Sequence, residues 1–113
     1  MVTKKLTDVE RRFIRSGGGS RALQLYRRRT LRLVASLIAS PALRGREHLD
    51  AKVRLLEIYR MIAGSNRGLA WMERAYLSLS ELAELLREGL DDESLMRLLG
   101  EIREELEGPS GEI

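Results

Sequence analysis

The sequence predicts an all-α fold: a small bundle of about five helices in a single domain. Three observations favour it. The chain has 113 residues, the size of one small domain. Leu, Arg, Glu and Ala dominate and aromatic residues make up only 4%, a composition typical of helices. Apolar residues also recur at helical spacing, and the two prolines, Pro41 and Pro109, lie where helices are expected to end.

A short first helix is expected within residues 1–16. The stretch "TDVERRFIR" opens with a capping box, in which Thr7 is followed three residues later by Glu10. Its apolar side carries Leu6, Val9 and Phe13. Glycines 17–19 then form a hinge, because each glycine costs about 1 kcal/mol relative to alanine inside a helix.

A core of four helices is expected over residues 20–107. Its first helix begins at Ser20, a favourable N-cap residue, and reaches about Ser40. Successive residues of a helix are rotated by about 100°, and this rotation divides the side chains of the helix between two opposite faces. The apolar face gathers Leu23, Tyr26, Thr30, Leu33, Val34, Leu37 and Ile38. The other face gathers Arg21, Arg28, Arg29 and Arg32.

The next helix of the core is expected from about Glu47 to Ala63, after the loop "SPALRGRE". Its apolar arc is wide, which favours a place at the centre of the bundle. The arc contains Leu49, Val53, Leu55, Leu56, Ile58, Tyr59 and Ile62. The stretch "AGSNRG" then breaks this helix.

Two further helices complete the expected core, and residues 108–113 form a tail. One runs from about Leu69 to Gly89 with apolar residues in the three-four spacing of an interhelical seam. These are Met72, Ala75, Leu79, Leu82 and Leu86. The last helix is capped by Asp91 or Asp92. It faces inward with Leu95, Leu98, Leu99, Ile102 and Leu106.

Charge is divided unevenly along the chain, although the net charge is only +3. Residues 1–70 hold 16 basic and 5 acidic side chains, whereas residues 71–113 hold 4 and 12. Between Ser20 and Ser40 there is no acidic residue at all. Like charges four residues apart in a helix, such as Arg28 and Arg32, cost a few tenths of a kcal/mol. An arginine stripe of this kind indicates an external polyanion or an acidic protein face as its partner.

The composition argues against an enzyme. The chain has no cysteine and one histidine, His48, so a catalytic triad or a cysteine- or histidine-rich metal centre lacks its parts. Carboxylate pairs such as Glu81 with Glu84 or Glu101 with Glu105 are typical of a solvated helix face. We therefore expect no catalytic residue, no cofactor and no metal.

No apolar run approaches the roughly 20 residues that cross a bilayer, and residues 1–6 lack the apolar core of a signal peptide. We therefore expect a cytoplasmic protein without a membrane partner. Arginines outnumber lysines by seventeen to three, which points to a thermophilic or GC-rich source.

The stretch "SGGGS", residues 16–20, has two interpretations. Glycine N–H groups before a helix N-terminus can cradle an anion, and Arg15 and Arg21 flank them. The alternative is a plain hinge, because the stretch lacks the Gly-Lys-Ser/Thr of a nucleotide-binding loop and does not follow a strand.

The arginines favour contact with a nucleic-acid backbone, since the planar guanidinium group can bind phosphate through two hydrogen bonds. The alternative is an adaptor or self-assembling protein that presents its basic face to acidic helices of a partner or another copy. The candidate binding residues on the second helix are Arg21, Arg28, Arg29 and Arg32. Loop contacts are expected from Arg44, Arg46 and Arg67, with Arg11, Arg12 and Arg15 behind them.

The stretches "SRALQLYRRRTLRL" and "AKVRLLEIYRMIAGSNRG" give residues 20–70 a resemblance to the small subunit of type III CRISPR effector complexes. Tyr26 matches the aromatic residue of that family's Gln-x-Arg-x-x-Tyr-like pattern, although Leu23 replaces the arginine. That family's Tyr-x-x-Gly-Arg pattern is partly matched, with different spacing, by Tyr59, Gly64 and Arg67. The resemblance implies a nonenzymatic, oligomeric subunit of an antiviral ribonucleoprotein, repeated along a guide RNA–target duplex. It favours RNA, or a duplex containing RNA, as the ligand.

Overall fold

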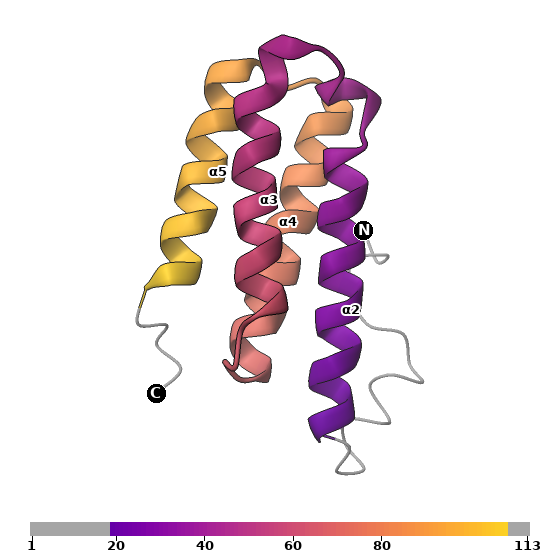
Figure 1. Ribbon diagram of the computed structural model, residues 1–113, viewed down its shortest axis with the longest axis vertical. Helices are drawn as coiled ribbons and strands as arrows, with labels where there is room; N and C mark the ends of the chain where they lie inside the picture. The colour runs from indigo at the N-terminus through magenta and orange to yellow at the C-terminus, as the bar shows by residue number, and fades with distance from the viewer. Residues whose placement is uncertain (1–18, 109–113) are drawn as a thin grey trace.

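The structure is a computed structural model that describes residues 19–108 (Figure 1). Within this range the secondary structure consists of helices alone, so the predicted all-α fold is confirmed. The expected helix before residue 17 and the tail after residue 108 lie outside the described residues. The elements are α2 (Gly19–Ile38), η2 (Pro41–Leu43), η3 (Arg46–His48), α3 (Leu49–Ala63), α4 (Leu69–Glu88) and α5 (Asp92–Glu107).

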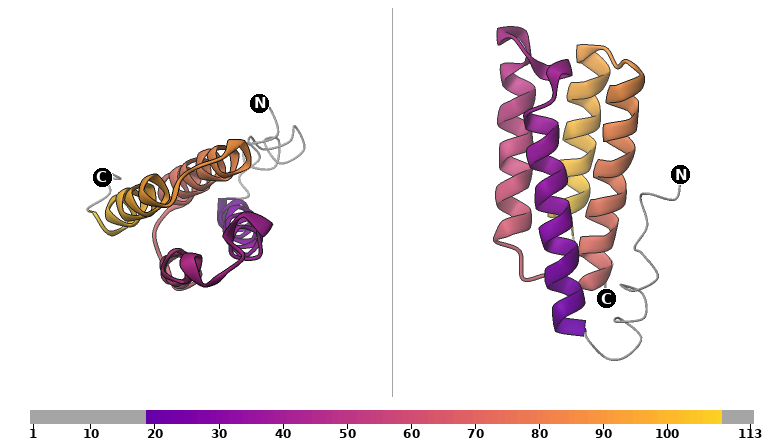
Figure 2. Two further views of the ribbon diagram at one scale, coloured as in Figure 1. Left: turned by 90° about the horizontal axis from the view of Figure 1, so that it is seen from above. Right: turned by 90° about the vertical axis from the view of Figure 1, so that its right-hand side faces the viewer.

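The four long helices form an up-down-up-down bundle. α2 and α4 run in one direction, and α3 and α5 run in the other (Figure 1). α2 packs against α3 and α4, and α5 packs against the same two helices. Seen from above, α3 and α4 lie across one diagonal of the bundle and α2 and α5 across the other (Figure 2). The basic helix α2 and the acidic helix α5 are therefore not neighbours.

α2 begins and ends close to its expected limits and buries the expected face. Tyr26, Thr30, Val34 and Leu37 are buried, while Leu23, Leu33 and Ile38 are partly buried. The hydroxyl of Thr30 has no access to solvent and donates to the carbonyl of Tyr26 at 2.7 Å. This bond satisfies the one polar side chain in the middle of the apolar face. After the helix, Ser40 accepts a hydrogen bond from the N–H of Ala42 at 3.1 Å and starts η2.

The third predicted helix differs from its expectation in one important way. α3 is a corner helix of the bundle, in contact with α2 and α5, and not a central one. It buries Ala51, Leu55, Ile58 and Ile62. Of the other residues of the wide arc, Tyr59 is partly buried, whereas Leu49, Val53 and Leu56 are exposed. The prediction of a central position was wrong because part of the apolar arc faces solvent instead of a neighbouring helix.

α4 and α5 bury the apolar faces that the sequence predicts for them. Every residue of the predicted α4 seam is buried, and so are all the α5 positions except Leu98, which is partly buried. Gly89 ends α4 with φ of 108°, in the region that favours glycine. Asp91 is the N-cap of α5 and accepts from the N–H of Ser94 at 3.2 Å. Hydrogen bonds from the side chain and the backbone of Ser94 hold the pKa of Asp91 below its usual value.

Two leucines on α4 allow a matched test of this core. Leu79 has no solvent exposure, whereas Leu77 is exposed. We expect Leu79→Ala to lower the free energy of unfolding by about 2–5 kcal/mol, since it removes buried methyl groups and leaves a cavity. Leu77→Ala should change it by about 0.5 kcal/mol or less. Urea denaturation followed by circular dichroism measures both, and equal losses would contradict the described packing.

Candidate nucleic-acid interface

The outer face of α2 carries the arginines that the sequence singles out. Burial of Tyr26, Thr30, Val34 and Leu37 fixes the rotation of the helix. Arg28 and Arg32, four residues apart on the opposite side, are exposed as a result. α2 contains no acidic residue over its 20 positions, so its own turns supply no carboxylate to either guanidinium group.

Arg28 and Arg32 also lack polar partners elsewhere in the part of the chain that the structure describes. None of the ion pairs or side-chain hydrogen bonds among residues 19–108 involves them. Arg21 and Arg29 differ, because each takes part in a contact within the chain. Arg21 is exposed and Arg29 is half-buried. Arg28 and Arg32 are therefore the arginines of α2 whose positive charge has no polar partner among the described residues.

The neighbouring Arg27 has a structural role. It points toward the loop between α3 and α4, where its Nη2 donates to the carbonyl of Ser65 at 2.6 Å. Its Nε is buried and has no hydrogen-bond partner among the described residues. Three consecutive arginines, 27–29, thus occupy three different environments, because 100° of rotation separates each from the next.

The predicted loop arginines divide into two groups. Arg44 and Arg46 are exposed in the connection that follows α2. Arg67 lies at the opposite end of the bundle, half-buried, where its Nη1 donates to the carbonyl of Gly108 at 3.0 Å. Its guanidinium carbon lies 5.6 Å from the ring centre of Trp71, a cation–π geometry. Arg67 is thus used within the fold.

Trp71 completes this internal cluster and lies in the core. It is buried and donates from Nε1 to the carbonyl of Leu106 at 3.2 Å. Arg11, Arg12 and Arg15 lie outside the described residues.

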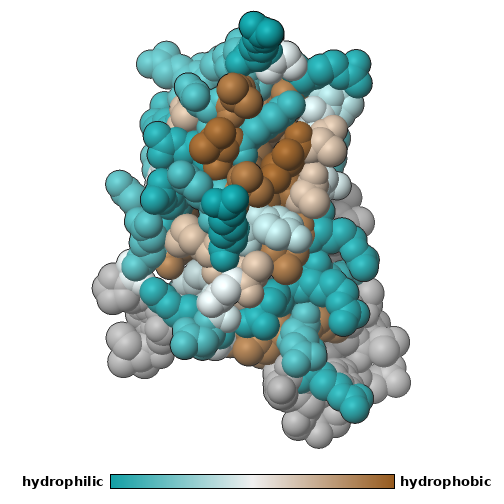
Figure 3. Space-filling view, in the orientation of Figure 1, coloured by the Kyte–Doolittle hydropathy of each residue, from teal (hydrophilic) through white to brown (hydrophobic). Residues whose placement is uncertain are grey.

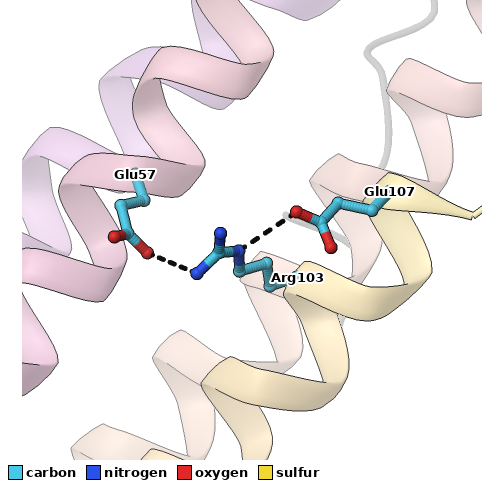
Figure 4. A network of polar contacts seen from close by, with 3 residues as sticks. All are labelled: Glu57, Arg103 and Glu107. Carbon is cyan, nitrogen blue, oxygen red and sulfur yellow. Dashed lines mark hydrogen bonds and ion pairs between the residues drawn. The ribbon is translucent and has the colours of Figure 1, made fainter.

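Ion pairs on the α5 side of the bundle join one arginine to two carboxylates. Arg103 on α5 lies 2.8 Å from Glu57 of α3 and 3.3 Å from Glu107 of its own helix (Figure 4). The Arg103–Glu57 pair bridges α3 and α5, on the side of the bundle away from α2.

His48 also pairs with carboxylates of the fold. Its Nδ1 lies 3.0 Å from Asp92 Oδ1, at the end of the bundle where α3 and α5 begin, without the alignment of a hydrogen bond. Its Nε2 lies 3.7 Å from Glu47 Oε2. His48 therefore lies between two carboxylates at the start of α3, and its side chain makes no capping hydrogen bond there.

A groove between α4 and α5 has an acidic border. It encloses about 200 Å³. Its floor is apolar, formed by Leu82, Leu85, Leu98 and Ile102. Glu81, Glu101 and Glu105 border it together with Ser78, whose hydroxyl donates to Glu105 at 3.1 Å. The bundle thus presents a basic helix face and an acidic groove on different helices.

No protein-family model matches the chain, and no curated protein or solved structure is significantly similar to it. The resemblance to CRISPR small subunits therefore stays a prediction. None of the described helices combines the length and apolarity needed to cross a membrane. Among residues 19–108, no three His, Asp or Glu side chains gather in a way that could hold a metal ion.

Neighbouring arginines provide a test of the charge arrangement. Arg27→Gln should lower the free energy of unfolding by about 1.5–3 kcal/mol, because it removes a charged donor to the Ser65 carbonyl. Arg28→Gln should leave stability unchanged or raise it by a few tenths of a kcal/mol, since it relieves repulsion from Arg32. Thermal and urea denaturation at low salt measure both. A large loss for Arg28→Gln would reveal an internal partner and remove the candidate interface.

Proposed function

We propose that the protein is a nonenzymatic, cytoplasmic helical subunit that binds the backbone of a nucleic acid without sequence specificity. The observation that carries the proposal is the pair Arg28 and Arg32: both are exposed and lack a polar partner among the described residues. Uncompensated like charges on one helix face oppose folding. Phosphates of a bound polyanion supply the missing negative charge.

The shape of this face suits phosphates. α2 rises about 1.5 Å per residue, so Arg28 and Arg32 lie about 6 Å apart along the helix axis. Two guanidinium groups at this spacing can contact neighbouring phosphates, each through two hydrogen bonds. Arg44 and Arg46 extend the exposed basic surface beyond the end of α2.

The aromatic residues favour backbone contact over base stacking. Tyr26 and Trp71 are buried, and Tyr59 and Tyr76 are partly buried against the core. Tyr26 and Tyr76 pack edge to face with ring centres 5.9 Å apart. Proteins that grip single strands by stacking need exposed aromatic rings, which residues 19–108 do not offer. A duplex, or a strand already ordered by other subunits, is the ligand that this surface fits best.

RNA, or a duplex containing RNA, is the preferred ligand in this proposal, in line with the resemblance of residues 20–70 to CRISPR small subunits. In such an assembly the chain acts as a repeated, noncatalytic subunit along the duplex. The proposal of backbone binding does not depend on that resemblance, because it rests on the charges of α2.

A second candidate function is favoured by the groove between α4 and α5. An apolar floor bordered by Glu81, Glu101 and Glu105 fits a basic amphipathic helix. The exposed outer face of α2 in another copy is basic, so the chain can act as a self-assembling adaptor in which this face of one copy meets the acidic border of the groove in the next. Head-to-tail contacts of this kind form rings or filaments.

The double variant Arg28→Gln/Arg32→Gln tests the first candidate. The matched control is Arg54→Gln/Arg74→Gln, which removes the same charge from exposed arginines of α3 and α4. We expect the first variant to weaken binding about ten-fold at low salt, equally for unrelated sequences, and the control to have little effect. The slope of log affinity against log salt should fall by about one to two units, the value for two lost phosphate contacts. Fluorescence anisotropy with RNA and DNA duplexes measures both quantities.

Two outcomes distinguish the candidates. If the wild-type chain binds no duplex at low salt, backbone binding is wrong. If the chain instead forms oligomers that dissociate at high salt and are lost in Arg28→Gln/Arg32→Gln, the adaptor function is supported. Size-exclusion chromatography after nuclease treatment separates these outcomes, because nucleic acid then no longer links the copies.

A further inference from the structure

Exposed apolar side chains concentrate on one helix. Of the five large hydrophobic residues that are exposed among residues 21–108, three lie on α3. Leu49, Val53 and Leu56 are 60%, 49% and 43% exposed. In Figure 3, viewed with α3 at the front, hydrophobic residues gather on the upper half of this face. We call Leu49, Val53 and Leu56 the α3 ridge.

The α3 ridge points away from the fold. At about 100° per residue it lies opposite Ala51, Leu55, Ile58 and Ile62, the residues that α3 buries. Since α3 contacts only α2 and α5 extensively, no described helix covers the ridge. The ridge residues are spaced four and then three positions apart, and Arg60 follows four positions after Leu56. Such alternating spacing is typical of the seam of a short two-helix coiled coil. Contiguous apolar surface of this kind marks an interaction site.

The geometry points to a second copy of this chain as the occupant, with α3 packed antiparallel against α3 about a two-fold axis. Such a pair is self-complementary, because the same ridge serves both sides of the contact. Val53 of each copy meets Leu56 of the other at the centre. Leu49 of each copy meets the aliphatic part of Arg60 at the ends.

Charge selects the antiparallel direction. Asp50 lies in the first turn of α3 and Arg60 in its last turn. Both are exposed, and neither has an ion-pair partner among the described residues. Antiparallel packing brings Asp50 of each copy to Arg60 of the other, whereas parallel packing sets Arg60 against Arg60. Antiparallel helices also oppose their macrodipoles.

The residues beside the α3 ridge are compatible with this pairing. Antiparallel packing brings Glu57 of one copy near Asp50 of the other, and two carboxylates repel each other. Glu57, however, already forms an ion pair with Arg103 at 2.8 Å, which offsets its negative charge. Because the contact comprises only a few turns of helix, the dimer should be weak and form in the micromolar range.

The dimer has a consequence that rests on the proposed function. α2 packs beside α3 in each copy, so pairing through α3 joins two arginine faces in one particle. Two linked faces bind a long polyanion with greater avidity than one face alone. The dimer itself needs no nucleic acid and is tested without it.

Sedimentation equilibrium of the full, nuclease-treated chain from micromolar to submillimolar concentration tests the dimer. We expect wild type to dimerise and Val53→Glu and Leu56→Glu to remain monomeric. Leu77→Glu, at an exposed apolar site of α4 outside the groove, is the matched control and should dimerise as wild type does. Circular dichroism checks that each variant is folded. A wild type that is monomeric throughout, or a dimer that is broken by Leu77→Glu and not by the α3 variants, overturns the proposal.

Disulfide trapping tests the direction, because the chain has no cysteine of its own. A mixture of Leu49→Cys and Arg60→Cys chains should cross-link to each other under mild oxidation. Leu49→Cys alone should not, since the two sites lie about 16 Å apart along antiparallel helices. Self-cross-linking of Leu49→Cys without the mixed product overturns the antiparallel arrangement. Because neither assay contains nucleic acid, failure of backbone binding leaves their outcomes unaffected.

Discussion

The burial of one face of α2 against α3 and α4 is the interaction on which the rest of the structure depends. It places Val34 and Thr30 out of contact with solvent and fixes the rotation of the helix. That rotation decides the role of each arginine in the run 27–29. Arg27 turns inward to the Ser65 carbonyl, while Arg28 turns outward together with Arg32. The core therefore determines which charges the protein presents.

The order of the helices places the most acidic helix away from the most basic one. α5 carries six acidic side chains and lies diagonal to α2, whereas α4, with four, packs against α2. Arg103 binds Glu57 and Glu107 at the far seam. The observed topology preserves a basic helix face on one side and an acidic groove on another, and such a separation favours binding of charged partners.

Much of the fold follows from local sequence signals. Periodicity locates α2 to α5 within a few residues, and the buried face of α2 correctly predicts the exposure of Arg28 and Arg32. Contacts between residues far apart in the sequence cannot be predicted from these local signals. A wide apolar arc on α3 does not distinguish a central helix from a corner helix with an exposed ridge. Arg67 contacts the Trp71 ring and the Gly108 carbonyl. These contacts depend on how the start of α4 packs against the end of α5, and the spacing of residues along the chain does not predict that packing.

We propose that the fold holds Arg28 and Arg32 outward for an external anion. The most direct measurement is an NMR titration that follows the arginine Nε–Hε resonances while a short duplex of arbitrary sequence is added. We predict that the resonances of Arg28 and Arg32 shift together, while those of Arg27 and Arg103, which are bound within the fold, stay in place. Unchanged Arg28 and Arg32 signals at saturating duplex would contradict the proposal.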